Sequence, residues 1–208
     1  MNLPNQLTLS RLVMTVAFLG AIMSRYRFGD TLALALFVAA SLTDLYDGRI
    51  ARQRKLITNF GILMDPLADK ILTCSAFIAL VERGLLTPQP AVFELGAFAF
   101  RPRVEAWMAV VIVARELIIT GLRMLAASKN VVLAADRSGK QKTILQMTAI
   151  ISLLTLEASA EWPAWLSGLL TLWAPIFTMA VMWLAVLLTA GSGFLYLWRN
   201  RALYLSDM

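Results

Sequence analysis

Residues 44–70, DLYDGRIARQRKLITNFGILMDPLADK, place four of the chain's seven aspartates in one short segment. These are Asp44, Asp47, Asp65 and Asp69. The apolar stretch TLALALFVAASLT (31–43) precedes the segment and ILTCSAFIALV (71–81) follows it. Carboxylates are costly at the edge of an apolar environment, so acids in this position indicate a functional site rather than solvated loop charges.

The composition predicts an integral membrane protein. The 208 residues are 59% hydrophobic and 15% charged, with a mean hydropathy of +0.71, whereas soluble domains carry about 25% charged residues. The apolar runs are continuous rather than alternating, which excludes a closed barrel and leaves an all-α fold. We expect a single domain covering residues 1–208, in the form of a membrane bundle.

Six segments are long and apolar enough, or nearly so, to cross a bilayer, which needs about 20 residues in a helix. They are Leu7–Ser24, Thr31–Ala51, Ile62–Val81, Val104–Ala126, Thr143–Ala158 and Leu169–Trp198. The last is long enough to tilt or to project from the membrane. The first residues, MNLPNQLTLS, lack the basic start of a cleaved signal peptide and predict an amphipathic interfacial segment.

Basic residues in the loops predict the orientation, because cytoplasmic loops are enriched in Lys and Arg. One side collects Arg49, Arg52, Arg54, Lys55, Arg123, Lys129, Arg137, Lys140, Lys142, Arg199 and Arg201. The other side has only Arg25, Arg27, Arg83, Arg101 and Arg103. Both termini and the aspartates are therefore expected at the cytoplasmic face, and a short chain without a transit peptide suggests a bacterial inner membrane.

The residue inventory restricts the chemistry. The chain has no histidine and one cysteine, Cys74, which excludes a histidine base, a Ser-His-Asp triad and sites ligated by histidine or several thiolates. A metal here must be held by oxygen ligands, which suits Mg²⁺, Ca²⁺ or Mn²⁺. The net charge of +6 fits a surface facing anionic lipid, and the basic residues are too scattered to predict nucleic acid as a partner.

Helical spacing predicts that the aspartates converge. Asp44, Asp47, Gly48, Ala51 and Arg52 fall on one face of a helix, and Asp65 and Asp69 fall on one face of the next. Pro66 is compatible with the first turn of this second helix. Four carboxylates at close range repel one another unless countercharge is present. Nearby Arg52 and Lys70 supply part of it. Two divalent cations would supply the remainder and could clamp a pyrophosphate.

The spacing Asp44-x2-Asp47-Gly48-x2-Ala51-Arg52-x8-Gly61-x3-Asp65-x3-Asp69 fixes eight positions over 26 residues. It resembles, at every position, the motif of the CDP-alcohol phosphatidyltransferase family. The resemblance implies transfer of the phosphatidyl group from CDP-diacylglycerol to an alcohol, with release of CMP. It also implies that Asp44, Asp47, Asp65 and Asp69 bind two Mg²⁺ or Mn²⁺ ions, that Asp69 is the general base, and that members form homodimers. The implied nucleotide-binding residues are Gly48, Ala51, Arg52 and Gly61, with Asn5, Thr8 and Arg11 as weaker candidates.

Three further stretches resemble the phosphatidylglycerophosphate synthase branch, whose acceptor is sn-glycerol 3-phosphate. They are NLPNQLTLSRL (2–12), RELIITGLR (115–123) and SGKQKTILQM (138–147). Arg115, Arg123, Lys140 and Lys142 could form a basic pocket for the acceptor phosphate, although cytoplasmic topology explains some of these charges equally well.

Other acceptors remain open, namely phosphatidylglycerol as in cardiolipin synthesis, or inositol phosphate, while a basic pocket disfavours serine. A cation transporter or channel would explain the acids. It would not explain the small residues at these offsets, nor acids at a membrane face rather than at the midplane. Packing between helices is a second explanation for the small residues.

Overall fold

The computed structural model describes residues 3–24, 26–54, 59–86, 93–95, 98–100, 102–129 and 138–205. Its helices are α1 (Leu3–Met23), α2 (Gly29–Arg54), α3 (Asn59–Leu86), α4 (Ala106–Ser128), α5 (Ser138–Ser159), α6 (Ala164–Thr171), α7 (Ala174–Arg199) and α8 (Arg201–Leu205). Two short strands, β1 (Phe93–Leu95) and β2 (Phe98–Phe100), pair antiparallel, with Phe93 opposite Phe100. The fold is thus a helical bundle with one small hairpin.

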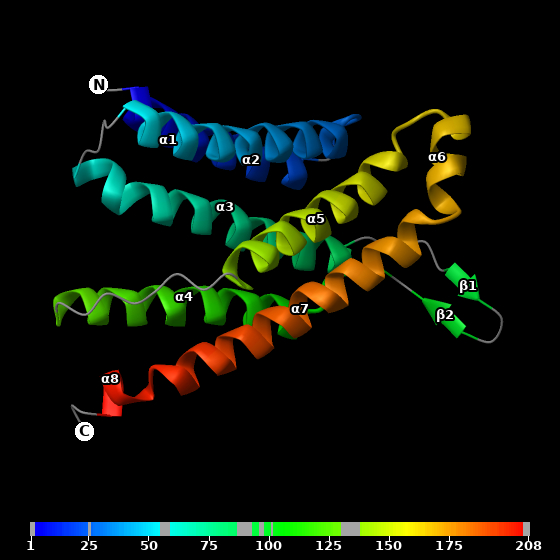
Figure 1. Cartoon of the computed structure of the whole chain (residues 1–208). Helices are drawn as coiled ribbons and strands as arrows, with labels where there is room; N and C mark the ends of the chain where they lie inside the picture. Colours follow the sequence, from blue (N-terminus) through cyan, green and yellow to red (C-terminus); the bar gives the residue numbers. More distant parts are fainter. Residues whose placement is uncertain are drawn as a thin grey trace.

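The bundle has two distinguishable ends (Figure 1). At one end, here called the motif end, α1 begins, α2 ends, α3 begins, α4 ends and α8 lies. The hairpin and α6 lie at the opposite end, here called the hairpin end. The first and last described helices therefore lie at the same end of the bundle as the end of α2 and the start of α3.

The helices match the expected segments closely, with one correction. Residues 169–198, expected as one long helix, are divided between α6 and α7, with a break at Leu172 and Trp173. Pro175 lies in the first turn of α7. A proline has no N–H to donate and disfavours helical backbone in the residue before it, so it begins a helix more readily than it continues one. The hairpin over 93–100 was not anticipated.

Two expectations near the start of helices are also corrected. The N-terminal segment is not separate in the described residues, because α1 runs without interruption from Leu3 to Met23. Pro66 lies inside α3 rather than in its first turn, because that helix already begins at Asn59. Apolar periodicity places a helix well, but helix ends depend on capping and packing that extend beyond the apolar run.

The core combines large aromatic side chains with small ones. Phe18 of α1 and Phe37 of α2 are fully buried, with ring centroids 5.6 Å apart, and Phe77 of α3 is fully buried as well. The same core contains alanines with no exposed surface on several helices: Ala33, Ala40, Ala76, Ala149 and Ala185. Small residues allow helix backbones to approach closely, which is the usual packing mode of helices in lipid.

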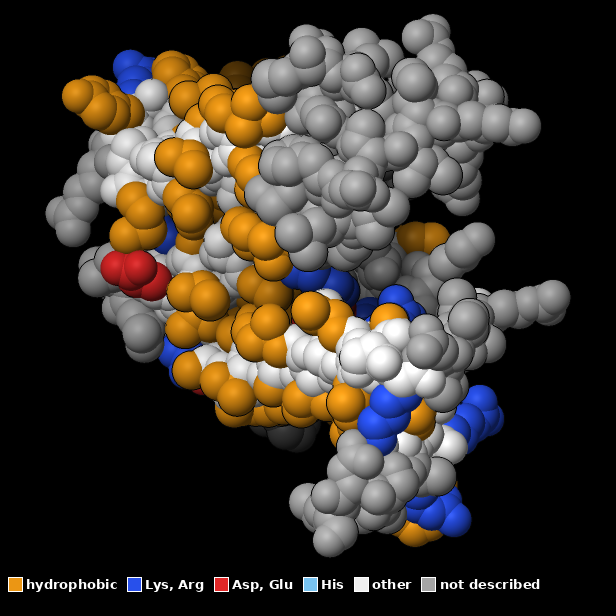
Figure 2. All heavy atoms as spheres, turned by 90° about the vertical axis from the view of Figure 1, so that its left-hand side faces the viewer, with side chains coloured by type: hydrophobic (Ala, Val, Ile, Leu, Met, Phe, Trp, Pro, Cys, Tyr) orange, Lys and Arg blue, Asp and Glu red, His pale blue; other side chains and the backbone are white. Residues whose placement is uncertain are grey.

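The outer surface of the bundle is strongly apolar. Among many others, Val13 and Val16 of α1, Val110 of α4 and Leu187 of α7 are more than 60% exposed. Figure 2 shows that hydrophobic side chains cover much of the described part of one face, with Lys and Arg side chains among them. Among the described residues α7 is long and apolar enough to cross a membrane, and shorter apolar stretches occupy Leu9–Met23 and Gly29–Thr43. Contiguous apolar surface of this kind is typical of contact with lipid.

A group of acids around one arginine joins three helices near the hairpin end. Arg83 of α3 donates through Nη2 to both carboxylate oxygens of Asp30 at the start of α2, at 2.6 and 2.7 Å, and lies 3.9 Å from Glu157 of α5. Glu161, just after α5, accepts hydrogen bonds of 2.9 Å from the backbone N–H groups of Asp30 and Thr31. We call Asp30, Arg83, Glu157 and Glu161 the acidic cluster.

Glu161 supplies a cap to α2 from a distant part of the chain. The first N–H groups of a helix have no partner within the helix, and a carboxylate that accepts from them stabilises the helix start. The Thr31 hydroxyl also donates to Glu161, at 2.6 Å, and accepts from the Trp162 indole at 3.0 Å. Burial raises the pKa of the Glu161 carboxyl, but these hydrogen bonds outweigh it and hold the pKa below its usual value. The acidic cluster therefore stabilises the fold.

Candidate active site

The motif lies on two helices that meet at the motif end. Asp44 and Asp47 are on α2, and Asp65 and Asp69 are on α3. The helical backbone at these positions gives each pair the shared face that its spacing predicted. The side chains of all four aspartates, and of Gly48, Ala51, Arg52 and Gly61, lie outside the described residues, as do those of Asn5, Thr8 and Lys140.

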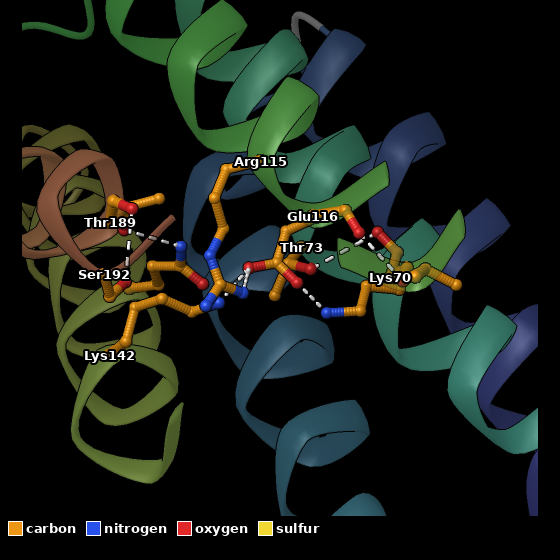
Figure 3. A network of polar contacts seen from close by, with 9 residues as sticks. Lys70, Thr73, Arg115, Glu116, Lys142, Thr189 and Ser192 are labelled. Atoms are coloured by element: carbon orange, nitrogen blue, oxygen red, sulfur yellow. Dashed lines mark hydrogen bonds and ion pairs between the residues drawn. The ribbon is translucent and has the colours of Figure 1, made fainter. Parts of the chain in front are cut away.

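A buried carboxylate, Glu116, is the centre of a second group of charges. Glu116 is 2% exposed and lies in the buried stripe of α4, between Ile112 and Ile119. Lys142 of α5 donates to its Oε1, Lys70 of α3 forms an ion pair with its Oε2, and the neighbouring Arg115 donates from Nη1 to Oε1 at 3.2 Å. Figure 3 shows these side chains meeting from three helices. We call Lys70, Arg115, Glu116 and Lys142 the basic cluster.

Charge balance explains why Glu116 can be buried among apolar residues. Removing a carboxylate from water costs several kcal/mol unless charged partners and hydrogen bonds compensate. Here three cations surround one carboxylate, and the side chains of Glu116, Lys142 and Arg115 are only 3%, 4% and 13% exposed. Lys70, the fourth member of the basic cluster, is 28% exposed. The cluster is therefore buried at Glu116 and Lys142 and reaches solvent at Lys70.

A hydrogen bond between α5 and α7 fixes the helix that carries Lys142. Gln146, one turn after Lys142 and 2% exposed, donates from Nε2 to the Thr189 hydroxyl of α7 at 3.1 Å. The Ser192 hydroxyl donates to the Thr189 carbonyl at 3.2 Å (Figure 3). A buried amide paired with a buried hydroxyl holds two helices in one register, because sliding would leave both groups without partners.

The structure brings together some of the basic residues predicted for the acceptor pocket and separates others. Arg115 and Lys142 meet at Glu116, although 26 residues separate Lys142 from Glu116. Arg123 is exposed on α4, and its guanidinium lies 5.9 Å from the centre of the Tyr196 ring. Arg11 is 1% exposed, which does not fit anchoring of this residue at the membrane surface.

Sequence reasoning gave little weight to Glu116 and treated Lys70 only as countercharge for the aspartates. Lys70 directly follows Asp69 in α3, so the basic cluster begins one residue from the last motif aspartate. A carboxylate within the apolar run VVIVARELIIT was a signal for Glu116. The partners of Glu116 depend on how α3, α4 and α5 pack.

The profile of the CDP-alcohol phosphatidyltransferase family matches residues 1–191 of the chain. The chain belongs to this family. The assignment made from the eight-position motif is thereby confirmed, and the matched region includes α2 and α3 with the motif and all four residues of the basic cluster.

Curated relatives share nearly the whole length of this phosphatidyltransferase. A Bacillus subtilis protein is 34% identical over 211 aligned residues, covering 96% of this chain and 95% of the relative. A Rickettsia felis protein is 33% identical, with 94% and 93% covered, and a Sodalis glossinidius protein is 30% identical, with 97% and 96% covered. All three are named CDP-diacylglycerol–glycerol-3-phosphate 3-phosphatidyltransferase.

Proposed function

We propose that this enzyme transfers the phosphatidyl group of CDP-diacylglycerol to sn-glycerol 3-phosphate, giving phosphatidylglycerol phosphate and CMP. The family and the names of its near full-length relatives support this reaction and make the chain a CDP-diacylglycerol-dependent phosphatidyltransferase of phospholipid biosynthesis. The structural observation that supports glycerol 3-phosphate as the acceptor is the basic cluster. In it Lys70 of the motif helix α3 converges with Arg115 and Lys142 on Glu116.

The basic cluster suits the phosphate of a soluble acceptor. A phosphate monoester carries close to two negative charges at neutral pH, since its second pKa is about 6. Arginine offers a planar pair of donors to phosphate, and lysine offers a compact positive charge. Buried cations gain more from such an anion than exposed lysines do, because water screens the interaction less. We assign acceptor-phosphate binding to Arg115 and Lys142, with Lys70 beside them.

The four motif aspartates are proposed to bind the metal ions and the donor. Carboxylate oxygens are the ligands that Mg²⁺ and Mn²⁺ prefer, and the pairs Asp44–Asp47 and Asp65–Asp69 each share a helix face, so the donor set fits divalent cations. Two such ions would neutralise the pyrophosphate of CDP-diacylglycerol. Gly48, Ala51, Arg52 and Gly61 remain the proposed nucleotide-binding residues.

Asp69 is proposed as the general base that accepts the proton of the acceptor hydroxyl. The chain has no histidine, and a carboxylate within hydrogen-bond reach of the hydroxyl can perform this role. Lys70 follows Asp69 directly, which would hold the acceptor phosphate close to the base. Binding of the phosphate and activation of the hydroxyl would thereby be coupled through one turn of α3.

We propose that six helices, α1–α5 and α7, cross a bacterial inner membrane. The exposed apolar side chains on α1, α4, α5 and α7 support lipid contact, and the concentration of basic residues at the motif end supports a cytoplasmic active site. The termini would then be cytoplasmic as well. A homodimer, implied by the family resemblance, is a further proposal that the mass of the purified protein in detergent would check.

The test is release of CMP from CDP-diacylglycerol by purified protein in detergent with Mg²⁺ or Mn²⁺, one acceptor at a time. Release that requires glycerol 3-phosphate and stops with a chelator is the expected result. If only phosphatidylglycerol or inositol phosphate supports release, phosphatidyl transfer from CDP-diacylglycerol is confirmed, but glycerol 3-phosphate is not the acceptor. No release with any acceptor would refute the proposed reaction.

A further inference from the structure

One buried face of α7 contacts the helices that carry the basic residues. Thr189, Gly193 and Tyr196 are spaced by four and three residues, and all three are buried, so they form one stripe of the helix. Thr189 accepts from Gln146 of α5, and the Tyr196 ring lies beside Arg123 of α4. Gly193, between them, lies against Arg115.

The contact at Gly193 requires the absence of a side chain. A Cβ atom on Gly193 would lie 2.8 Å from Cγ of Arg115 and 3.8 Å from its Nε. Cγ belongs to the stem of the arginine, close to its backbone, so unless α7 itself is displaced it moves away by a turn of the side chain about χ1. Such a rotation swings the guanidinium, which now lies 3.2 Å from Glu116, to a different place.

A second glycine on the same helix differs in this respect. Gly191 is exposed, and an added Cβ there would meet nothing within 4 Å. Glycines in membrane helices often serve close packing of backbones, but the atoms nearest Gly193 belong to the side chain of Arg115. The function of Gly193 is therefore tied to the direction in which Arg115 points.

We infer that Gly193 is a positioning residue for the acceptor site: its missing side chain lets the α7 backbone lie against the stem of Arg115 and directs the guanidinium toward the acceptor phosphate. This inference rests on the proposed function, in which Arg115 binds that phosphate. Gly193 itself touches no substrate. It acts through Arg115, because the backbone at position 193 limits the position of that side chain on one side.

The experiment compares Gly193→Ala with the matched control Gly191→Ala in the CMP-release assay. Both substitutions replace a helical glycine by alanine two residues apart, so both favour the helix by a similar amount. Gly193→Ala is expected to raise the KM for glycerol 3-phosphate roughly tenfold or more, as expected when a charge-assisted hydrogen bond is lost. The KM for CDP-diacylglycerol should not change in either variant, and Gly191→Ala should behave as wild type.

Combining Gly193→Ala with Arg115→Ala tests whether Gly193 acts through Arg115. Arg115→Ala removes Cγ, the atom that an alanine at 193 would strike. Adding Gly193→Ala to Arg115→Ala should therefore leave the KM for glycerol 3-phosphate where Arg115→Ala alone puts it, a non-additive result that coupled positions give. A further rise in the double variant, comparable to the rise in wild type, would overturn the inference, because Gly193 would then act through general displacement of α7.

The outcomes separate this inference from the proposed function. An unchanged acceptor KM in Arg115→Ala would refute the assignment of Arg115 to the acceptor and the inference with it. A raised KM in Arg115→Ala with a normal KM in Gly193→Ala would refute the inference alone. If Gly193→Ala does not fold, the comparison of Arg115→Ala with the double variant decides: equal acceptor KM supports the inference, and an unfolded or weaker double variant overturns it.

Discussion

The basic cluster and the acidic cluster are opposite in composition and differ in burial. In the first, one carboxylate, Glu116, meets three cations; in the second, one cation, Arg83, lies among three carboxylates. Glu116 and Lys142, at the centre of the basic cluster, have side chains 3% and 4% exposed, although its Arg115 and Lys70 are 13% and 28% exposed. In the acidic cluster, Arg83, Asp30 and Glu157 are 17%, 17% and 33% exposed. Water screens charges near the surface, while buried cations interact more strongly with an anionic ligand.

The two clusters also differ in the groups that their hydrogen bonds join. In the acidic cluster Glu161 accepts from two backbone N–H groups and from Thr31, which ties the start of α2 to the end of α5. These are the bonds of a helix cap, and they hold the fold together. The contacts of the basic cluster are between side chains of three helices, next to the family motif. We therefore expect the acidic cluster to serve stability and the basic cluster to serve the proposed binding of the acceptor.

The largest expected effect lies at the motif beside the basic cluster. Asp69→Asn should lower turnover by about two to four orders of magnitude, the usual contribution of a general base, because an amide cannot accept the proton. The melting temperature in detergent should stay near that of wild type. CMP release and thermal unfolding measure the two quantities, and near-normal turnover would remove Asp69 from the role of base.

Lys142→Gln should affect binding more than folding. Losing one cation of the basic cluster should raise the KM for glycerol 3-phosphate roughly ten- to a hundredfold, the equivalent of about 1.5–3 kcal/mol for a hydrogen bond to a charged group. The KM for CDP-diacylglycerol should remain unchanged. Steady-state CMP release with each substrate varied in turn measures both constants, and an equal rise in both would contradict a specific role at the acceptor.

Arg83→Gln should show the reverse pattern. Without its guanidinium, Asp30 and Glu157 face each other with no cation between them, and stability should fall by about 1–3 kcal/mol. Thermal unfolding should report a lower melting temperature, while both KM values stay close to wild type. A raised KM for glycerol 3-phosphate in Arg83→Gln would contradict the expectation that the acidic cluster affects stability and not acceptor binding.

The smallest effect should come from Glu161→Gln and should depend on pH. The folded-state pKa of Glu161 is lowered, so its charged form stabilises the fold above its ordinary pKa and that stabilisation is lost as pH falls through the lowered value. The melting temperature of the variant should therefore lie below that of wild type at pH 7. The gap should close under acidic conditions, where both side chains are neutral. A gap that persists in acid would show that Glu161 does not act through its charge.

The sequence by itself determined the helices and the family. Continuous apolar runs require helices, since lipid offers the backbone no hydrogen bonds, and this local rule located α1 to α5 closely. The motif on residues 44–69 identified the phosphatidyltransferase because its eight positions are read along the chain and need no tertiary contact.

Only the tertiary structure decided which distant polar groups meet. Lys142 reaches Glu116 across 26 residues, and Glu161 caps α2 across about 130. The contact of Gly193 with Arg115 also depends on how α4 and α7 are packed. Hydrophobic periodicity fixes which face of a helix is buried, but the rotation and register of neighbouring helices decide which side chains on those faces touch.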